Sequence, residues 1–318
     1  MKRHTFPLAL TAVLSMIVLT GCGGDDEPTK ADDPATSAAS QPTSPDSTAS
    51  TPSSTEPAAT ETTTDAGSPE TTSVPVYFVG DTPQGTRLYS EQREVEADNP
   101  PGESVALLMA GDVTDPDYRT LVPAGSLGTD VSFDGTGADG FYTLNLTDAQ
   151  WAERPAGMSK SEAQLAVQQI VYTLLSQAAA GDIDGAKGGV DFYLDGERTT
   201  FLGVAGTASP AASLDVRALV NVSSPAEGET VNGSFQASGA ASSFEATVPW
   251  EIRDDAGAVV QQGFATADGW ADKLYPWQSD VDVSKLDPGT YTFVALTDDP
   301  SDGEGAGPTE DSRTIVVE

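Results

Sequence analysis

The sequence has almost none of the side chains on which most nucleophilic and metal-dependent enzymes rely. Its 318 residues include a single histidine, His4, and a single cysteine, Cys22, and His4 lies in a segment that we expect to be removed. Ser-His-Asp triads, Cys-His nucleophiles and zinc sites built on histidine and cysteine are therefore excluded. A disulfide within the chain is excluded as well, because the one thiol has no partner. We predict that the protein is not an enzyme and that it needs no cofactor.

Basic residues are also scarce, since 15 Lys and Arg stand against 49 Asp and Glu, for a formal net charge of −34. Nucleic-acid phosphates and anionic lipid headgroups repel such a surface. We therefore expect no nucleic-acid partner. So much acid is typical of a well-solvated secreted surface.

Long hydrophobic runs are absent apart from residues 6–19, which follow the basic Lys2 and Arg3. That run is too short to span a bilayer and is typical of an export signal. It ends in Leu19-Thr20-Gly21-Cys22, which resembles the lipobox of bacterial lipoproteins. The resemblance implies that residues 1–21 are a signal peptide and that Cys22 carries palmitate and anchors the chain in the lipid bilayer. An ordinary secretory signal with a chance cysteine is the alternative.

Residues 22–73 contain no aromatic residue and consist almost entirely of Ser, Thr, Pro, Ala, Asp and Glu. Such a segment cannot bury enough apolar surface to offset its chain entropy. We interpret it as a disordered acidic linker. A flexible chain of about 50 residues averages about 40 Å end to end, so the linker would give the rest of the protein reach from the membrane.

Residues 74–206 alternate strand and helix signals and predict an α+β domain. Expected strands cover 74–79, 88–95 and the alternating apolar residues near 131–133 and 142–146, and a short helix covers 103–110. A longer helix follows the capping box Ser159 to Glu162 and presents one broad apolar face until Gly181. Asp195-Gly196 predicts a two-residue hairpin loop after a strand at 190–194.

This region resembles the GerMN domain of GerM-type spore germination and sporulation proteins. The matching segments are Val76–Phe78, Ala106–Leu108 with Gly111, Leu121–Gly125, Leu144–Leu146, Gln169–Leu174 and Val190–Gly196. The resemblance implies the fold of the small α/β ring-building modules of secretion and sporulation complexes. No catalytic residues carry over from it.

Residues 215–318 show only strand signals separated by turns, about seven short strands in roughly 100 residues, which fits an immunoglobulin-like β-sandwich. Val248, Trp250 and Ile252 are expected to face its core, with Pro249 on an edge or at a bulge. The region resembles the immunoglobulin-like domain of bacterial spore germination proteins. The matching segments are Ser224–Val231, Phe244–Val248, Trp250–Ile252, Ser301–Gly305 and Thr314–Val317.

Two candidate sites stand out in this second domain. Trp270, Tyr275 and Trp277 lie close together and are a candidate aromatic platform for a sugar ring or a peptide, although aromatic residues in a small sandwich are usually core. The weaker candidate is one loop with four acidic residues that suit calcium, for which an ordinary acidic surface is the commoner explanation. These residues are Asp298, Asp299, Asp302 and Glu304.

The sequence thus predicts a lipid-anchored protein on the extracytoplasmic face of the cell membrane, with a non-enzymatic binding or scaffolding role. The process would be germination- or sporulation-like, or associated with the cell wall. An envelope protein or peptidoglycan is the expected partner. The alternatives are a cell-wall glycan hydrolase that uses paired carboxylates and a calcium-dependent adhesion module.

Overall fold

The computed structural model describes residues 70–179, 183–299, 305 and 307–318. Residues 65–318 form one compact unit. No helix within the described part is long and apolar enough to cross a membrane. The predicted signal peptide, Cys22 and most of the predicted linker lie outside the described residues.

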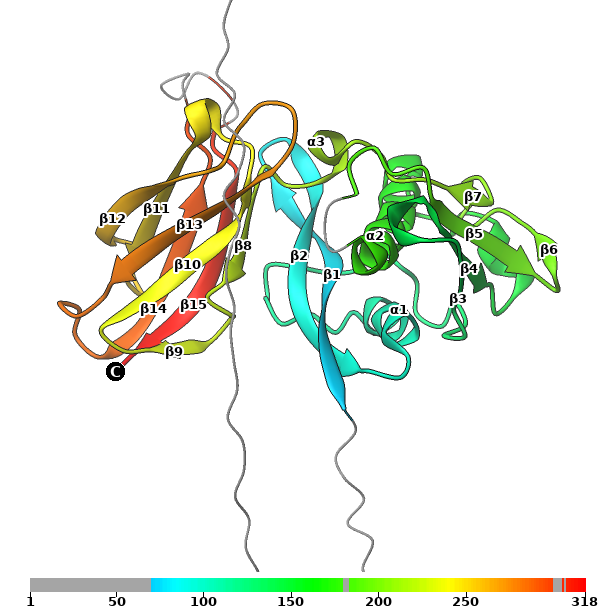
Figure 1. The fold of residues 1–318 in the computed structure, drawn as a ribbon, viewed down its shortest axis with the longest axis horizontal. Coiled ribbons are helices and arrows are strands. Elements are labelled where there is room, and N and C mark those ends of the chain that lie inside the picture. Colours follow the sequence, from blue (N-terminus) through cyan, green and yellow to red (C-terminus); the bar gives the residue numbers. More distant parts are fainter. Residues whose placement is uncertain (1–69, 180–182, 300–304, 306) are drawn as a thin grey trace, which may run out of the picture. The chain divides into compact units, whose positions relative to one another are not determined.

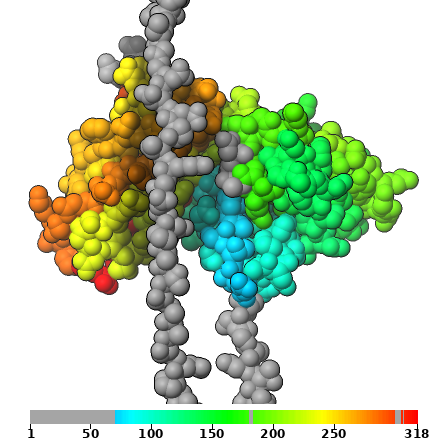
Figure 2. All heavy atoms as spheres, in the orientation of Figure 1, coloured from blue at the N-terminus to red at the C-terminus, as the bar shows by residue number. Residues whose placement is uncertain are grey.

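The first domain begins with a long antiparallel hairpin (Figure 1). Strands β1 (Thr71–Thr82) and β2 (Gly85–Glu96) pair along their whole length around a two-residue loop. Both strands were predicted, but β1 starts three residues earlier than the expected strand at Val74. In the space-filling view, this cyan hairpin reaches the surface on the face shown (Figure 2).

Both predicted helices are present, and local capping defines their ends. Helix α1 (Pro100–Ala110) stops at Gly111, whose left-handed φ of 63° suits glycine. Helix α2 (Lys160–Ala178) starts with the predicted capping box: the Ser159 hydroxyl accepts from the Glu162 amide at 3.1 Å, and the Glu162 carboxylate accepts from the Ser159 amide at 2.7 Å. The helix ends before Gly181, which lies outside the described residues.

A small mixed sheet completes the first domain. Its strands are β3 (Ser132–Asp134), β4 (Phe141–Asn145), β5 (Gly189–Leu194), β6 (Glu197–Arg198) and β7 (Thr207–Ala208), with short 3-10 turns η1 (Gly137–Asp139) and η2 (Ala149–Ala152). Strands β4 and β5 are parallel, and β5 turns into β6 through the predicted Asp195-Gly196 loop, where both residues have positive φ. Because β7 pairs with β5, this sheet extends past residue 206.

One predicted strand differs from the structure. Every residue of β3 is exposed, so the expectation of a half-buried strand there is wrong. Phe133 is 40% exposed and packs against Tyr142 of β4, with 4.5 Å between the ring centroids. The strand is only three residues long and lies at the edge of the sheet.

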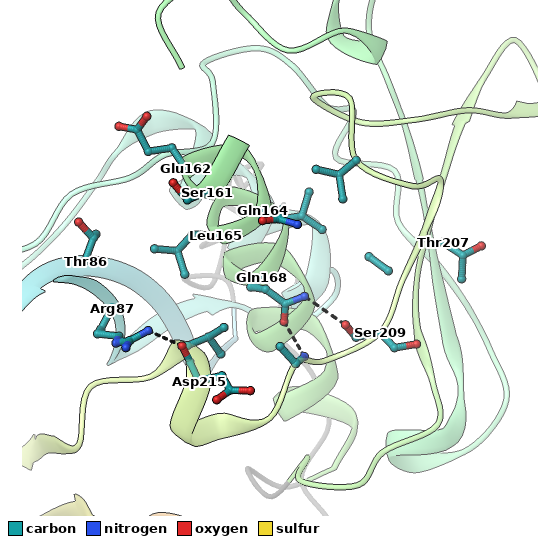
Figure 3. Close-up of a pocket in the computed structure, with 15 residues that line it drawn as sticks. Thr86, Arg87, Ser161, Glu162, Gln164, Leu165, Gln168, Thr207, Ser209 and Asp215 are labelled. Atoms are coloured by element: carbon teal, nitrogen blue, oxygen red, sulfur yellow. Dashed lines mark hydrogen bonds between the residues drawn. The ribbon is translucent and has the colours of Figure 1, made fainter. Parts of the chain in front are cut away.

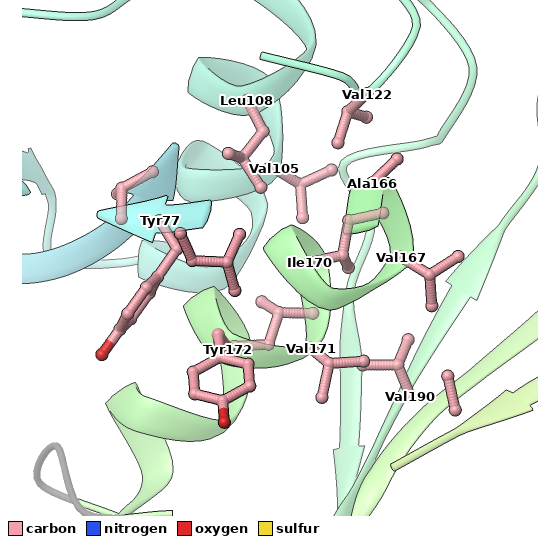
Figure 4. Close-up of a cluster of buried hydrophobic side chains, with 14 of the residues drawn as sticks. Tyr77, Val105, Leu108, Val122, Ala166, Val167, Ile170, Val171, Tyr172 and Val190 are labelled. Atoms are coloured by element: carbon pink, nitrogen blue, oxygen red, sulfur yellow. The ribbon is translucent and has the colours of Figure 1, made fainter. Parts of the chain in front are cut away.

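Helix α2 is the centre of the first domain rather than a cover on one face of a sheet (Figure 4). The predicted apolar face is buried, but Gln169 and Thr173 on other faces are fully buried too. Both bind the backbone of Tyr77 in β1: Thr173 accepts from its amide at 2.9 Å and Gln169 donates to its carbonyl at 3.1 Å. The helix therefore satisfies backbone groups that a neighbouring strand would otherwise satisfy.

The second domain is a β-sandwich that follows a short helix, α3 (Ser213–Val216). One sheet has the order β13-β10-β8 and the other β12-β11-β14-β15-β9, in agreement with the predicted immunoglobulin-like fold. The strands are β8 (Val220–Ser224), β9 (Glu229–Val231), β10 (Ser234–Ala241), β11 (Thr247–Arg253), β12 (Val259–Thr266), β13 (Tyr275–Asp282), β14 (Gly289–Leu296) and β15 (Glu310–Val317), with the 3-10 turn η3 (Phe244–Ala246) before β11.

Strand β11 has the predicted alternation, because Val248, Trp250 and Ile252 are all buried. The predicted edge position of Pro249 is wrong, since β11 lies between β12 and β14. The pairing with β14 covers only Trp250–Arg253, so Pro249 lies just beyond that ladder. Its missing N–H therefore removes no bond from the pairing with β14.

Candidate functional site

Two aromatic side chains are exposed together at one end of the sandwich. Phe244 in η3 is 39% exposed, and Trp270 in the loop before β13 is 44% exposed. Their ring centroids are 5.2 Å apart and their planes meet at 73°, an edge-to-face pair. Large side chains that remain exposed as a pair are uncommon on a soluble domain and mark candidate binding surfaces.

The backbone around this pair has an unfavourable conformation. Glu245, Ala246 and Ala271 have φ values of 51°, 61° and 81°, a left-handed region that costs a residue other than glycine roughly 1–2 kcal/mol. Each of these residues adjoins Phe244 or Trp270, or follows within two positions. Strain of this kind persists only where surrounding contacts impose it, and it concentrates at functional sites.

Two serines supply those contacts. The Ser242 hydroxyl accepts from the amide of Ala271 at 3.2 Å, which ties the Trp270 loop to the end of β10. The buried Ser243 hydroxyl accepts from the amide of Asp298 at 2.7 Å. The Ala246 carbonyl accepts from the amide of Ala267 at 2.9 Å. The aromatic pair therefore stands on a hydrogen-bonded framework.

The predicted trio of Trp270, Tyr275 and Trp277 does not form one platform. Trp277 is 3% exposed and belongs to the sandwich core, where it follows the same alternation as Val281 of β13. That period of two was visible in the sequence and would have identified Trp277 as a core residue. Tyr275 is half-buried. Its hydroxyl donates to Asp272 at 2.7 Å, a bond that raises its pKa above the usual value.

Trp270 is exposed, and its partner is Phe244, which the sequence indicated only as part of a segment that matches the immunoglobulin-like family. The left-handed residues Glu245 and Ala246 separate Phe244 from β11 and turn it away from the alternating pattern. Neither is glycine or asparagine, so the sequence carried no local signal for this bend.

The acidic loop proposed for calcium is only partly described. Asp298 and Asp299 are described, whereas Asp302 and Glu304 lie outside the described residues. Within the described part of the chain there is no group of three acidic, histidine or cysteine side chains arranged to hold a metal ion.

The first domain has a groove of about 570 Å³ between helix α2 and the segment that leads to α3 (Figure 3). Leu165 of α2 lines it, and the Gln168 side chain bridges it to that segment by donating to the Ser209 carbonyl at 3.1 Å and accepting from the Ala211 amide at 2.9 Å. Arg87 of β2 donates to the Asp215 carbonyl. The groove is chemically mixed, and Glu162 at its end is engaged in the helix cap.

The two domains meet through a buried polar network. Arg313 of β15 donates to the carboxylates of Asp115 and Asp311, and the Tyr118 hydroxyl donates to Asp311 at 2.5 Å. Asp115 and Tyr118 belong to the first domain, and all four residues are at most 5% exposed. The second Asp311 oxygen accepts from the Asn221 side chain at 2.9 Å. The network positions the two domains, and a cavity of about 60 Å³ beside Asp115 and Arg313 and another of about 350 Å³ beside Tyr118 and Asp311 adjoin it.

The network contains two carboxylates and one guanidinium, so its charges do not balance. Burial raises the pKa of Asp115 to about 7, although the neighbouring Arg313 pulls it down. Burial also raises the pKa of the Tyr118 hydroxyl, and nearby Asp311 adds to the effect. Burial opposes the charge of Arg313, but the surrounding carboxylates outweigh it and raise the pKa of the guanidinium.

Two family models match the chain, one to each domain. Residues 75–200 match the Germane family, described as sporulation and spore germination, and residues 219–304 match Gmad2, the immunoglobulin-like domain of bacterial spore germination. The chain therefore carries a Germane domain followed by a Gmad2 domain. Both resemblances drawn from the sequence are confirmed. Neither family is known for enzymes, and no curated protein matches the chain.

Solved structures similar to the chain have low identity. Tandem GerMN domains of the sporulation protein GerM from Bacillus subtilis share 13% identity with a TM-score of 0.32, over 69% of this chain and 64% of that one. CopC from Methylosinus trichosporium OB3b shares 22% with a TM-score of 0.22, over 31% of this chain and 93% of that one. A Jonesia denitrificans lytic polysaccharide monooxygenase shares 12% with a TM-score of 0.20, over 30% of this chain and 60% of that one.

Proposed function

We propose that the protein is a lipid-anchored, non-enzymatic envelope module that binds cell-wall glycan through Phe244 and Trp270 of its Gmad2 domain. The process would be germination- or sporulation-like, or associated with the cell wall. The observation that carries the proposal is the exposed aromatic pair held by a strained backbone. A flexible, unstrained loop would be the expected result if the pair had no role.

The surroundings of the pair favour a sugar ring as the ligand. Aromatic faces stack against the apolar C–H faces of pyranose rings, and side chains with polar tips at the rim bind the hydroxyl groups. Glu245, Asp268 and Asp272 are exposed beside the two aromatic residues and provide hydrogen-bond acceptors. The net charge of −34 repels polyanionic ligands. The sugar backbone of peptidoglycan is therefore the cell-wall ligand most compatible with this surface.

Cosedimentation of residues 65–318 with purified peptidoglycan tests the proposal, because this segment is a compact unit on its own. We expect binding, and we expect Trp270→Ala to weaken it about tenfold through loss of roughly 1–1.5 kcal/mol of aromatic contact. The matched control is Phe133→Ala, which removes an aromatic side chain of similar exposure from the Germane domain. Equal binding by both variants would refute the site, and soluble sugar released from the wall would identify a hydrolase instead.

The membrane anchor requires a separate test in the full chain. If Cys22 carries lipid, Cys22→Ser should move the protein from the membrane fraction to the soluble fraction, because acyl chains supply the binding energy. Both domains should remain folded, since the substitution lies outside residues 65–318. A variant that stays on the membrane would contradict the lipoprotein assignment.

A further inference from the structure

Strand β12 is an unusual edge strand. It ends the five-stranded sheet and, among the described residues, pairs only with β11 (Figure 1). It is eight residues long and contains neither a charged residue nor proline. Natural sheets usually protect their edges from other strands with short length, charge, proline or a β-bulge, and β12 has only a register shift near its start, between Val259 and Gln261.

Among the described residues, the other edge strands have one of these protections except β8, whose Asn221 side chain accepts from the Ser90 amide of β2 at 3.0 Å. Strands β3, β6 and β9 have two or three residues. Strand β13 contains Pro276, Asp280 and Asp282. Two other eight-residue strands, β10 and β14, are equally uncharged, but both lie inside their sheets, whereas β12 lies at an edge.

The side chains of β12 are also apolar on the outside. Phe264 is 69% exposed, and Val259 and Val260 are 46% and 44% exposed. Phe264 faces outward on the same side as its partner Pro249, and the nearest outward acid, Glu251, is paired with Arg253 at 2.8 Å. The exposed strand thus combines a free backbone edge with an uncharged, apolar outer face.

The register shows which backbone groups point to the free edge. The Ala267 amide donates to the Ala246 carbonyl, which fixes the bonded pairs that alternate along β11 and β12. Gln262, Phe264 and Thr266 then fall in the non-bonded pairs, so their N–H and C=O groups point away from β11. These groups are available to a further antiparallel strand.

We propose that β12 pairs with β12 of a second copy of this chain, in an antiparallel two-fold arrangement. An uncharged strand offers no ion pair to a basic or acidic partner, whereas β12 complements itself. With Gln262 opposite its own symmetry mate, Phe264 of each copy lies against the start of the other β12, where Val259 and Val260 are exposed at a register shift. The two five-stranded sheets become one continuous sheet across the dimer.

Charge sets the strength of this pairing. Each copy carries a formal charge of −34, so long-range repulsion opposes association outside the uncharged contact strip. Salt screens that repulsion, with a Debye length of about 10 Å at 0.1 M. A small edge-to-edge contact of this kind is expected to have a Kd on the order of 10–100 µM and to tighten as salt is added.

Sedimentation equilibrium of residues 65–318, across protein concentration and at low and high NaCl, tests the dimer. Two variants target β12: Phe264→Lys adds a charge at the contact, and Gln262→Pro removes an outward N–H without taking a bond from β11. Each should weaken dimerisation at least tenfold. Phe133→Lys adds the same charge at an exposed aromatic of the other domain and should leave it unchanged.

A protein that stays monomeric at high concentration in both salts would overturn the proposal. So would a dimer that persists in both β12 variants while they remain folded by near-UV circular dichroism. Neither outcome bears on glycan binding, which depends on Phe244 and Trp270 and is measured separately.

Discussion

Raising the pH from 5 to 8 should destabilise the folded protein through Asp115, and Asp115→Asn should remove this dependence. The Asp115 carboxyl is 2% exposed, and burial raises its pKa to about 7, against 3.8 for the group in an unfolded chain. Between these two values the native state holds a proton that the unfolded chain has released. The contribution of this proton to the free energy of unfolding is therefore fully present below pH 3.8 and is lost as the pH rises through 7.

The magnitude follows from this difference in proton binding. One proton bound only in the native state changes the free energy of unfolding by at most about 1.4 kcal/mol per pH unit. Integrated from pH 5 to 8 with a native pKa of about 7, the loss is about 2–3 kcal/mol, most of it below pH 7. The groups that face Asp115 are Arg313, Asp311, Tyr118, Asp117 and the Glu91 carboxylate, which accepts from the Asp115 amide at 2.7 Å.

Urea denaturation of residues 65–318 at several pH values measures this loss. The other carboxylates and the overall negative charge also contribute to the pH dependence, so the informative quantity is the difference between wild type and Asp115→Asn. The stability advantage of the wild type over the variant should shrink by about 2–3 kcal/mol between pH 5 and pH 8, because only the wild type releases the Asp115 proton over that range. Parallel pH profiles for the two proteins would refute a protonated Asp115 at the junction.

Two further predictions concern packing. Gln169→Leu should cost about 2–4 kcal/mol in chemical denaturation, because the Tyr77 carbonyl and the Leu121 amide both lose a buried partner; a loss below about 0.5 kcal/mol would contradict this. Gly239→Ala should prevent stable folding of the sandwich, since a Cβ there would lie 1.8 Å from the Asn221 carbonyl oxygen. Gly128→Ala, whose nearest neighbour would be 3.7 Å away, is the control and should melt close to wild type in circular dichroism.

Features that depend on neighbours in sequence were predictable. The capping box of Ser159 and Glu162 and the Asp195-Gly196 loop form through contacts over two to four residues, so their sequence patterns suffice. The alternation of β11 was equally visible. The family resemblance then placed these elements in two domains, and the matched models confirm it.

Features that depend on distant contacts were not predictable. Asp115 and Arg313 are 198 residues apart, and only their meeting in space makes them a buried pair. A partial signal existed in β15, where Asp311 and Arg313 share the inward alternation of Ile315 and Val317. Charged residues at inward positions of a strand indicate that something polar covers them, but not what covers them.

In the candidate binding surface, too, one residue was predictable from the sequence and the other was not. Trp270 was identified by its closeness in sequence to other aromatic residues, whereas Phe244 is exposed because of the left-handed backbone of Glu245 and Ala246, which only the folded domain shows. Trp277 was misassigned because proximity in sequence was given more weight than its alternation with Val281.

The buried network between the domains also constrains how such proteins can evolve by recombination. A Gmad2 domain cut out with Arg313 and Asp311 would expose this charged cluster, and one joined to a foreign module would bury it without Asp115 and Tyr118. Either product is penalised, so exchange of one domain alone should be rare. The Germane and Gmad2 domains of this protein are expected to be inherited as a pair, with substitutions at residues 115, 118, 311 and 313 occurring together.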